Sequence, residues 1–268
     1  MTTVAAVAAV MDSLAPLATQ MDWDNSGLLV GDPAGEVSGI LVALDATLEV
    51  IREAQNLGAQ MIVTHHPVIF HPVKQFLAGD PPYEAAVRGI AVYSAHTCYD
   101  MAEGGINTAL AGALGLRNCL PLWEERPGDP ASRRLGLVGD LPCAMTREEL
   151  AAWVEEALGL PQNYVRHLPQ AGPETVCRVA VCGGAGSDFL GEAVNAGCQA
   201  YLTGEVRRHE YLEAERMGLL LLDGGHFATE NIAMPVLREQ LAKALPEVEV
   251  RLSRQATDQR PQALPPRG

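Results

Sequence analysis

One pattern occurs twice along this chain, and the repeat limits the possible folds more than any other feature. When Thr64 is placed on Thr203 without gaps, the residues before the two threonines match at several positions. The identical pairs are Glu53 and Glu192, Ala54 and Ala193, Asn56 and Asn195, Gly58 and Gly197, and Gln60 and Gln199. Such self-similarity indicates two duplicated units. The alternative is that two unrelated units look alike because helix, glycine and strand follow one another in both.

Helical and strand patterns alternate through most of the sequence. Residues 48–57 have the apolar spacing of an amphipathic helix, and Gly58 is suited to end it. In the second half, Thr146 and Glu149 predict a capping box at the start of another helix. Strands that alternate with helices favour an α/β fold with largely parallel sheets. Together with the repeat, this predicts two pseudo-symmetric α/β lobes.

A loop rich in proline, glycine and charge at residues 124–134 is the predicted boundary between the lobes. We therefore expect an N-terminal lobe over residues 1–124 and a C-terminal lobe over residues 125–252. Residues 253–268 form a polar, proline-rich tail for which we expect disorder.

Charge and composition exclude several classes of partner. The net charge of −14 repels phosphate backbones, so nucleic acid is not an expected partner. No run of 18 apolar residues occurs, so we expect no membrane span. The six cysteines form no CxxC pair, and the first residues lack the basic start of a signal peptide. These features predict a cytoplasmic protein with reduced thiols.

Histidines and carboxylates gather at the ends of the predicted strands. They are His65, His66, His96, Asp100, Glu205, His226 and Glu230. Functional groups of parallel sheets collect beyond the carboxyl ends of the strands, and a four-residue step keeps Asp100 on the side of His96, and Glu230 on that of His226. Nitrogen and oxygen donors suit a divalent metal.

The donors outnumber the four that one tetrahedral ion needs, which favours two ions with Glu230 as the bridge. A single histidine at a strand end is usually a hydrogen-bonded core residue, so the prediction depends on the whole group.

Other residues are open to two interpretations. Residues 183–186 resemble a phosphate-binding turn but lack the GxGxxG spacing, which favours a plain tight turn. His209 either holds a ligand or lies at the surface. Asn25 and Asp45 either contact the substrate and ligands or form turns. Cys98 is interpreted as a bystander.

Several motifs together resemble the NIF3-like proteins, also labelled GTP cyclohydrolase 1 type 2. They lie at residues 23–28, 64–67, 95–100, 203–205 and 225–230. The resemblance implies a two-lobed α/β fold with a dinuclear metal site between the lobes, and a ring-shaped hexamer. The ligands that it implies are His65, His66, Asp100, His226 and Glu230. The sequence departs from the family's usual pattern at Cys98 and Tyr99, between His96 and Asp100, which leaves the implied ligand Asp100 intact but would alter the wall of the pocket.

The expected function is hydrolysis by a metal-activated water, since two cations lower the pKa of a bridging water from ~15.7 toward ~7. We expect Glu230 and His96 to be catalytic and the cations to be Zn, Mn, Fe or Ni. The resemblance implies opening of the guanine ring of GTP, and hence a small-molecule substrate such as a nucleotide. The alternative is a metal-binding regulatory or assembly protein without turnover, whose site would be closed to solvent.

Overall fold

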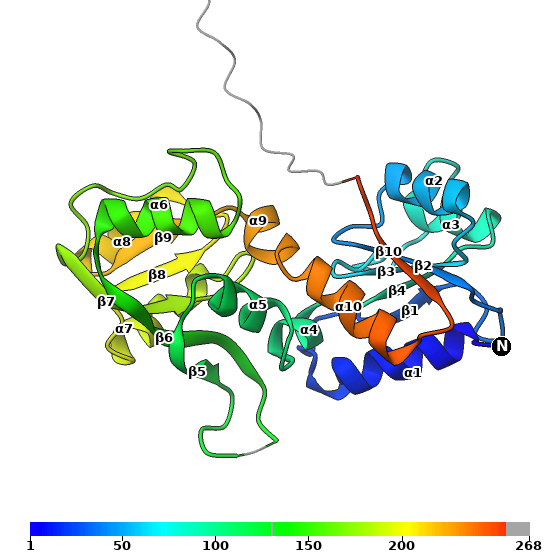
Figure 1. Cartoon of the computed structure of the whole chain (residues 1–268), viewed down its shortest axis with the longest axis horizontal. Helices are drawn as coiled ribbons and strands as arrows, with labels where there is room; N and C mark the ends of the chain where they lie inside the picture. Colours follow the sequence, from blue (N-terminus) through cyan, green and yellow to red (C-terminus); the bar gives the residue numbers. More distant parts are fainter. Residues whose placement is uncertain (130, 256–268) are drawn as a thin grey trace, which may run out of the picture.

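The chain folds around two five-stranded sheets that lie at opposite ends of an elongated molecule (Figure 1). The computed structural model describes residues 1–129 and 131–255. Between the sheets lie α4 (Thr97–Met101), α5 (Ile106–Ala113) and α9 (His226–Asn231). The predicted α/β class is confirmed, and each sheet comes mainly from one half of the chain, except that β10 (Glu249–Leu252) joins the first sheet.

The first sheet is mostly parallel and is covered on both faces. In spatial order its strands are β1 (Gly27–Val30), β4 (Ala91–Ser94), β3 (Met61–Thr64), β2 (Gly39–Ala43) and β10 (Glu249–Leu252). Only β1 runs antiparallel to its neighbour. Every residue of β3 and β4 is buried, as expected for parallel strands with helices on both sides. On one face pack α1 (Val4–Leu14) and α10 (Met234–Ala244), and on the other α2 (Leu48–Leu57) and α3 (Pro81–Val87).

The second sheet combines an antiparallel and a parallel half. Its order is β5 (Arg117–Glu124), β6 (Arg134–Thr146), β7 (Thr175–Val181), β8 (Ala200–Thr203) and β9 (Leu220–Asp223). The pairs β5–β6 and β6–β7 are antiparallel, whereas β7–β8 and β8–β9 are parallel. One face is covered by α5 and α6 (Arg147–Ala157), and the other by α7 (Leu190–Asn195) and α8 (Arg208–Arg216). Two short 3-10 turns, Leu17–Thr19 and Ser187–Phe189, complete the regular structure.

The last segment of the chain returns to the first sheet. β10 pairs in parallel with β2, and α10 buries Leu237 and Leu241 in the core that α1 also covers. The predicted division had assigned this segment to the C-terminal lobe of residues 125–252. The physical reason for the difference is that β2 would have an unpaired edge without β10, and that α10 buries apolar side chains in the core of the first sheet. Residues 256–268 of the expected tail lie outside the described residues, whereas Ser253 still bonds to β2 through the carbonyl of Val42.

The structure supports the repeat in detail. Gly58 and Gly197 both end their helices with a positive φ, 67° and 73°. Gln60 and Gln199 both use their side-chain oxygen to accept two backbone N–H groups of the adjoining strand. The offset that superposes Thr64 on Thr203 also relates the strand pairings: Ile40 faces Met61, and Val179 faces Ala200. The two α–β units are therefore equivalent in their hydrogen bonding as well as in sequence.

Some predictions of local structure in the second half of the chain are confirmed and others are not. The capping box of Thr146 and Glu149 is confirmed at the start of α6. No strand was predicted over β5, whose first four residues are exposed and which Pro121 interrupts. The sheets are more mixed than the expected largely parallel ones. In the part of the chain that the structure describes, no helix is long and apolar enough to cross a membrane.

Candidate metal centre

The predicted donors meet where strands of both sheets end. His65 and His66 directly follow β3, and His96 follows β4 and precedes α4, which carries Asp100. His226 and Glu230 lie one turn apart on α9, which follows β9 of the second sheet. α9 reaches across from the second sheet to the first. The site is therefore built from segments that lie far apart in the sequence.

Glu230 is the centre of the cluster. Its Oε2 lies 3.0 Å from Nε2 of His66 and 3.0 Å from Nε2 of His226. Its Oε1 lies 3.5 Å from Nε2 of His65, and Oδ1 of Asp100 is 3.8 Å from the same nitrogen. Three sets of donors each lie within 4.8 Å of one another: His65, His66 and His96; His66, His226 and Glu230; and His65, Asp100 and Glu230. These sets share members, so the donors form one continuous cluster.

Each of the four histidines has an oxygen beside its Nδ1. The pairs are His65 with the carbonyl of Ala95 at 2.9 Å, His66 with Asp45 at 2.7 Å, His96 with Asp24 at 2.9 Å, and His226 with Glu205 at 3.2 Å. Metal-binding histidines usually donate their second ring N–H to a carboxylate or carbonyl, and the hydrogen bonds of His65, His66 and His96 fit this arrangement. The contact of His226 with Glu205 is only an ion-pair distance. The arrangement turns the Nε2 atoms of His65, His66 and His226 toward Glu230.

Buried polar atoms without partners also fit a cation. Nε2 of His65 and Oδ1 of Asp100 are buried and have no hydrogen-bond partner among the residues that the structure describes. Nearly all buried polar atoms in proteins have one. The Nε2 atoms of His66 and His226 lie only 3.2 Å apart. If both Nδ1 atoms carry protons, two lone pairs and a carboxylate oxygen converge, and a positive charge is needed among them.

The pKa values of the clustered side chains also indicate that the site favours a positive charge. Burial lowers the pKa of His66, but hydrogen bonds to Asp45 and Glu230 outweigh it and raise the pKa to about 10. Burial also lowers the pKa of His226, yet Glu230 raises it to about 9. Burial raises the pKa of Glu230, but His65 and the other nearby histidines hold it well below its ordinary value. Burial raises the pKa of Asp100 to about 7. Protons on His66 and His226 thus take the place of a cation.

Glycines allow the backbone to approach the cluster closely. A Cβ on Gly204 would lie 2.5 Å from the backbone nitrogen of His226, and one on Gly184 would collide with the Glu230 carboxylate. Glu205, next to Gly204, has a φ of 54°, which is uncommon for a residue with a side chain.

The turn at residues 183–186 is a tight turn, as its spacing indicated. The backbone N–H groups of Gly183, Gly184 and Gly186 donate to side chains of Asn107, Thr229 and Thr203. These groups are therefore not available to hold a phosphate.

The residues around the cluster match a known family model. The model of Duf34/NIF3 (NGG1p interacting factor 3) matches residues 2–259, almost the whole chain. The chain belongs to the Duf34/NIF3 family. This confirms the resemblance that the sequence motifs indicated.

Relatives of this Duf34/NIF3 protein match most of its length. A protein of Clostridium perfringens (strain 13 / Type A) named GTP cyclohydrolase 1 type 2 homolog is 33% identical over 93% of this chain and 95% of its own length. One of Streptomyces coelicolor with the same name is 39% identical over 82% of this chain and 79% of its own.

Solved structures of the family have the same fold. A Bacillus cereus protein related to NIF3 aligns with a TM-score of 0.88 at 24% identity, covering 98% of this chain and 99% of that one. A Staphylococcus aureus hypothetical protein aligns with a TM-score of 0.87 at 27% identity, covering 97% and 99%.

In this Duf34/NIF3 chain, two residues whose roles the sequence left open lie beside the cluster. Asp45 holds Nδ1 of His66, and the side-chain nitrogen of Asn25 donates to the carbonyl of Ile69 at 2.6 Å. Sequence reasoning did not single out Asp24, although it belongs to the motif at residues 23–28. The role of Asp24 depends on its hydrogen-bond partner His96, which lies more than 70 residues away in the chain. A local sequence pattern does not show such a partner.

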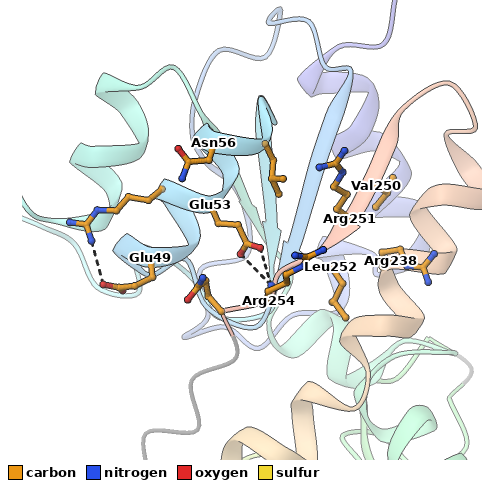
Figure 2. Close-up of a pocket in the computed structure, with 11 residues that line it drawn as sticks. Glu49, Glu53, Asn56, Arg238, Val250, Arg251, Leu252 and Arg254 are labelled. Carbon is orange, nitrogen blue, oxygen red and sulfur yellow. Dashed lines mark hydrogen bonds and ion pairs between the residues drawn. The ribbon is translucent and has the colours of Figure 1, made fainter.

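Other candidates of the Duf34/NIF3 chain lie away from the cluster. The side chain of His209 is 69% exposed, and Cys98 is buried and in none of the donor sets found among the described residues. A groove between α2 and β10 is lined by polar and apolar residues, among them Glu49, Glu53 and Arg254 (Figure 2). None of the predicted donors is among its lining residues, so we do not assign the chemistry to it.

Proposed function

We propose that this protein is a hydrolase that depends on two divalent metal ions held by His65, His66, Asp100, His226 and Glu230. One observation carries the proposal: Nε2 of His66 and Nε2 of His226 lie 3.2 Å apart, each 3.0 Å from the same oxygen of Glu230. Three acceptors in this arrangement call for a cation among them. Bound divalent ions would supply a water whose pKa lies near ~7.

Within this proposal, Glu230, Asp24 and His96 have different roles. Glu230 offers one oxygen toward His66 and His226 and the other toward His65, which suits a bridging carboxylate. Asp24 keeps its charge because its pKa lies well below the ordinary value, so it accepts the proton on Nδ1 of His96. With Nδ1 bonded to Asp24, Nε2 is the ring nitrogen of His96 that remains for proton transfer. His96 is the proposed general base and acid.

The donor set and the family define the substrate and metals only broadly. Imidazole and carboxylate donors suit Zn, Mn, Fe or Ni. Relatives are named GTP cyclohydrolase 1 type 2 homolog, so we propose a small-molecule substrate of the nucleotide type and ring opening as the reaction to test first. The hexamer that the family resemblance implies is part of the same proposal.

The test compares metal content and turnover in three variants. Glu230→Gln should reduce bound metal from about two equivalents per chain to below one and abolish turnover. His96→Gln should keep its metal and slow turnover by about 10²- to 10⁴-fold. Glu49→Gln, the control in the groove of Figure 2, should change neither. Metal is measured by elemental analysis, and turnover as formate released from GTP and as hydrolysis of p-nitrophenyl phosphate.

Two results would contradict the proposal. Full turnover by Glu230→Gln would show that the cluster is not the site of reaction. Two bound metals with no turnover of either substrate by the wild-type protein would favour the metal-binding protein without catalysis.

A further inference from the structure

Two exposed aromatic side chains lie at the edge of the metal centre. Trp23 is 61% exposed and Phe70 is 38% exposed, and their ring centroids are 6.1 Å apart. We call this pair the aromatic rim. The other two tryptophans are better covered: the indole N–H of Trp153 donates to the carbonyl of Leu114, and Trp123 packs on Phe189. Large apolar rings left in water mark binding surfaces more often than single small side chains do.

The aromatic rim is continuous with the cluster of donors. The imidazole of His96 lies 6.0 Å from the ring of Trp23 and 5.8 Å from that of Phe70, centre to centre. The same imidazole lies 5.2 Å from the ring of His65 and 5.8 Å from that of His66, centre to centre. His96 is therefore a neighbour both of the rim and of the donors His65 and His66. A molecule resting on the rim places its next few atoms at the cluster.

Hydrogen bonds hold the two parts of the rim together. The side chain of Asn25 donates to the carbonyl of Ile69, which joins the segment of Trp23 to the segment of Phe70. The side chain of Asp24 is buried and bonds to His96 and to Thr97, which fixes the backbone just after Trp23. The rim is therefore set in place before a ligand arrives, which lowers the entropic cost of binding.

The shape of the rim favours a flat ring as its ligand. The planes of Trp23 and Phe70 are inclined by 59°, so the two rings are not stacked on each other, and Trp23 is 61% exposed. Aromatic side chains stack on planar bases and rings irrespective of their substituents. An acyclic phosphoester or a peptide would leave the Trp23 ring unused.

We propose that Trp23 and Phe70 bind a planar aromatic or heteroaromatic ring of the substrate, such as a nucleobase, and place the adjoining bond at the metal centre. This inference rests on the proposed hydrolase function. It narrows the substrate class to compounds that carry such a ring within a few bonds of the group that reacts.

The test measures binding instead of turnover. Guanosine 5′-monophosphate and ribose 5-phosphate share the sugar and phosphate and differ only in the base. Calorimetric titration of the zinc-loaded full-length protein should show tighter binding of the nucleotide. Trp23→Leu should weaken nucleotide binding by about 5- to 100-fold and leave ribose 5-phosphate unchanged. Trp23→Phe should retain most of the affinity, and Trp123→Phe, the matched control, all of it.

Phe70→Leu is the second variant, should Trp23→Leu lose its zinc or its melting transition. The proposal is overturned if Trp23→Leu binds the nucleotide like the wild type, if it weakens both ligands equally, or if the wild type binds no nucleotide. It is also overturned if Trp23→Leu alters only the oligomeric state in sedimentation, because the rim is then a contact between copies. If the nucleotide binds through Trp23 but is not turned over, the proposed hydrolase function is refuted and the ring-binding role of the rim stands. If turnover occurs and Trp23→Leu does not change it, the ring-binding role is refuted and the hydrolase function stands.

Discussion

At the scale of single residues, the geometry of the candidate metal centre depends on side chains outside the donor sets. Asp24 is the clearest case, because its buried carboxylate bonds to His96 and to both the backbone and the hydroxyl of Thr97. Burial raises the pKa of Asp24, but these hydrogen bonds outweigh burial and hold the pKa well below the ordinary value. The carboxylate therefore stays charged wherever the protein is folded and orients His96 throughout.

This shift predicts a specific dependence of stability on pH. Because the pKa of Asp24 is lower in the folded than in the unfolded chain, its contribution is complete above the unfolded value of about 4 and is lost as pH falls below it. Asp24→Asn should cost about 2 kcal/mol at pH 7 and less at pH 3. Melting temperatures from pH 7 to pH 3 would test this, with the exposed Asp188→Asn as control. An equal loss at both pH values would contradict it.

At the scale of elements, the repeat carries a hydrogen-bond arrangement as well as a sequence. Gln60 and Gln199 each follow a helix that ends at a glycine with positive φ, and each side chain accepts two backbone N–H groups of the next strand over. The two glutamines thus join a helix end to a sheet in the same way in both halves. This equivalence explains why both positions have kept the same residue.

Because Gln60 and Gln199 are equivalent, substituting either one should destabilise the protein by a similar amount. Gln60→Ala and Gln199→Ala each leave two backbone donors without their acceptor, so each should lower the free energy of unfolding by about 1–3 kcal/mol. The sites lie in different sheets and should be additive in the double variant. Urea unfolding would measure all three proteins. A large cost at one position and none at the other would refute the structural equivalence.

At the scale of the whole molecule, the proposed metal site joins the two sheets. His65 and His66 follow a strand of the first sheet, whereas His226 and Glu230 lie on α9, directly after a strand of the second. A cation held by both sets would stabilise the arrangement of the two sheets as well as each local turn. α10 and β10 provide a second link, since they continue from α9 into the first sheet.

Metal should therefore raise the thermal stability of the entire chain. Zinc at about 100 times its Kd should stabilise the folded state by about 2.7 kcal/mol, or roughly 5 to 10 °C in Tm, and a chelator should reverse this. Scanning calorimetry of wild type and Glu230→Gln would measure it. The variant should not respond to zinc; a shift of the same size in both proteins would point to binding elsewhere.

Features that depend on neighbours in the chain could be predicted from the sequence. The helix at 48–57, its glycine end, the capping box at Thr146 and the histidines at strand ends all follow from local spacing. The family motifs also identified the histidines and carboxylates that are candidate metal ligands or catalytic residues, and the structure brings six of them together.

Contacts between distant segments were decided only by the tertiary structure. No local pattern shows that β10 returns to β2, that the exposed strand β5 pairs with β6, or that Asp24 lies beside His96. The same holds for the 3.2 Å approach of His66 to His226 and for the packing of Trp23 on Phe70. Local spacing sets which atoms a segment offers, whereas packing of the whole chain sets which offered atoms meet.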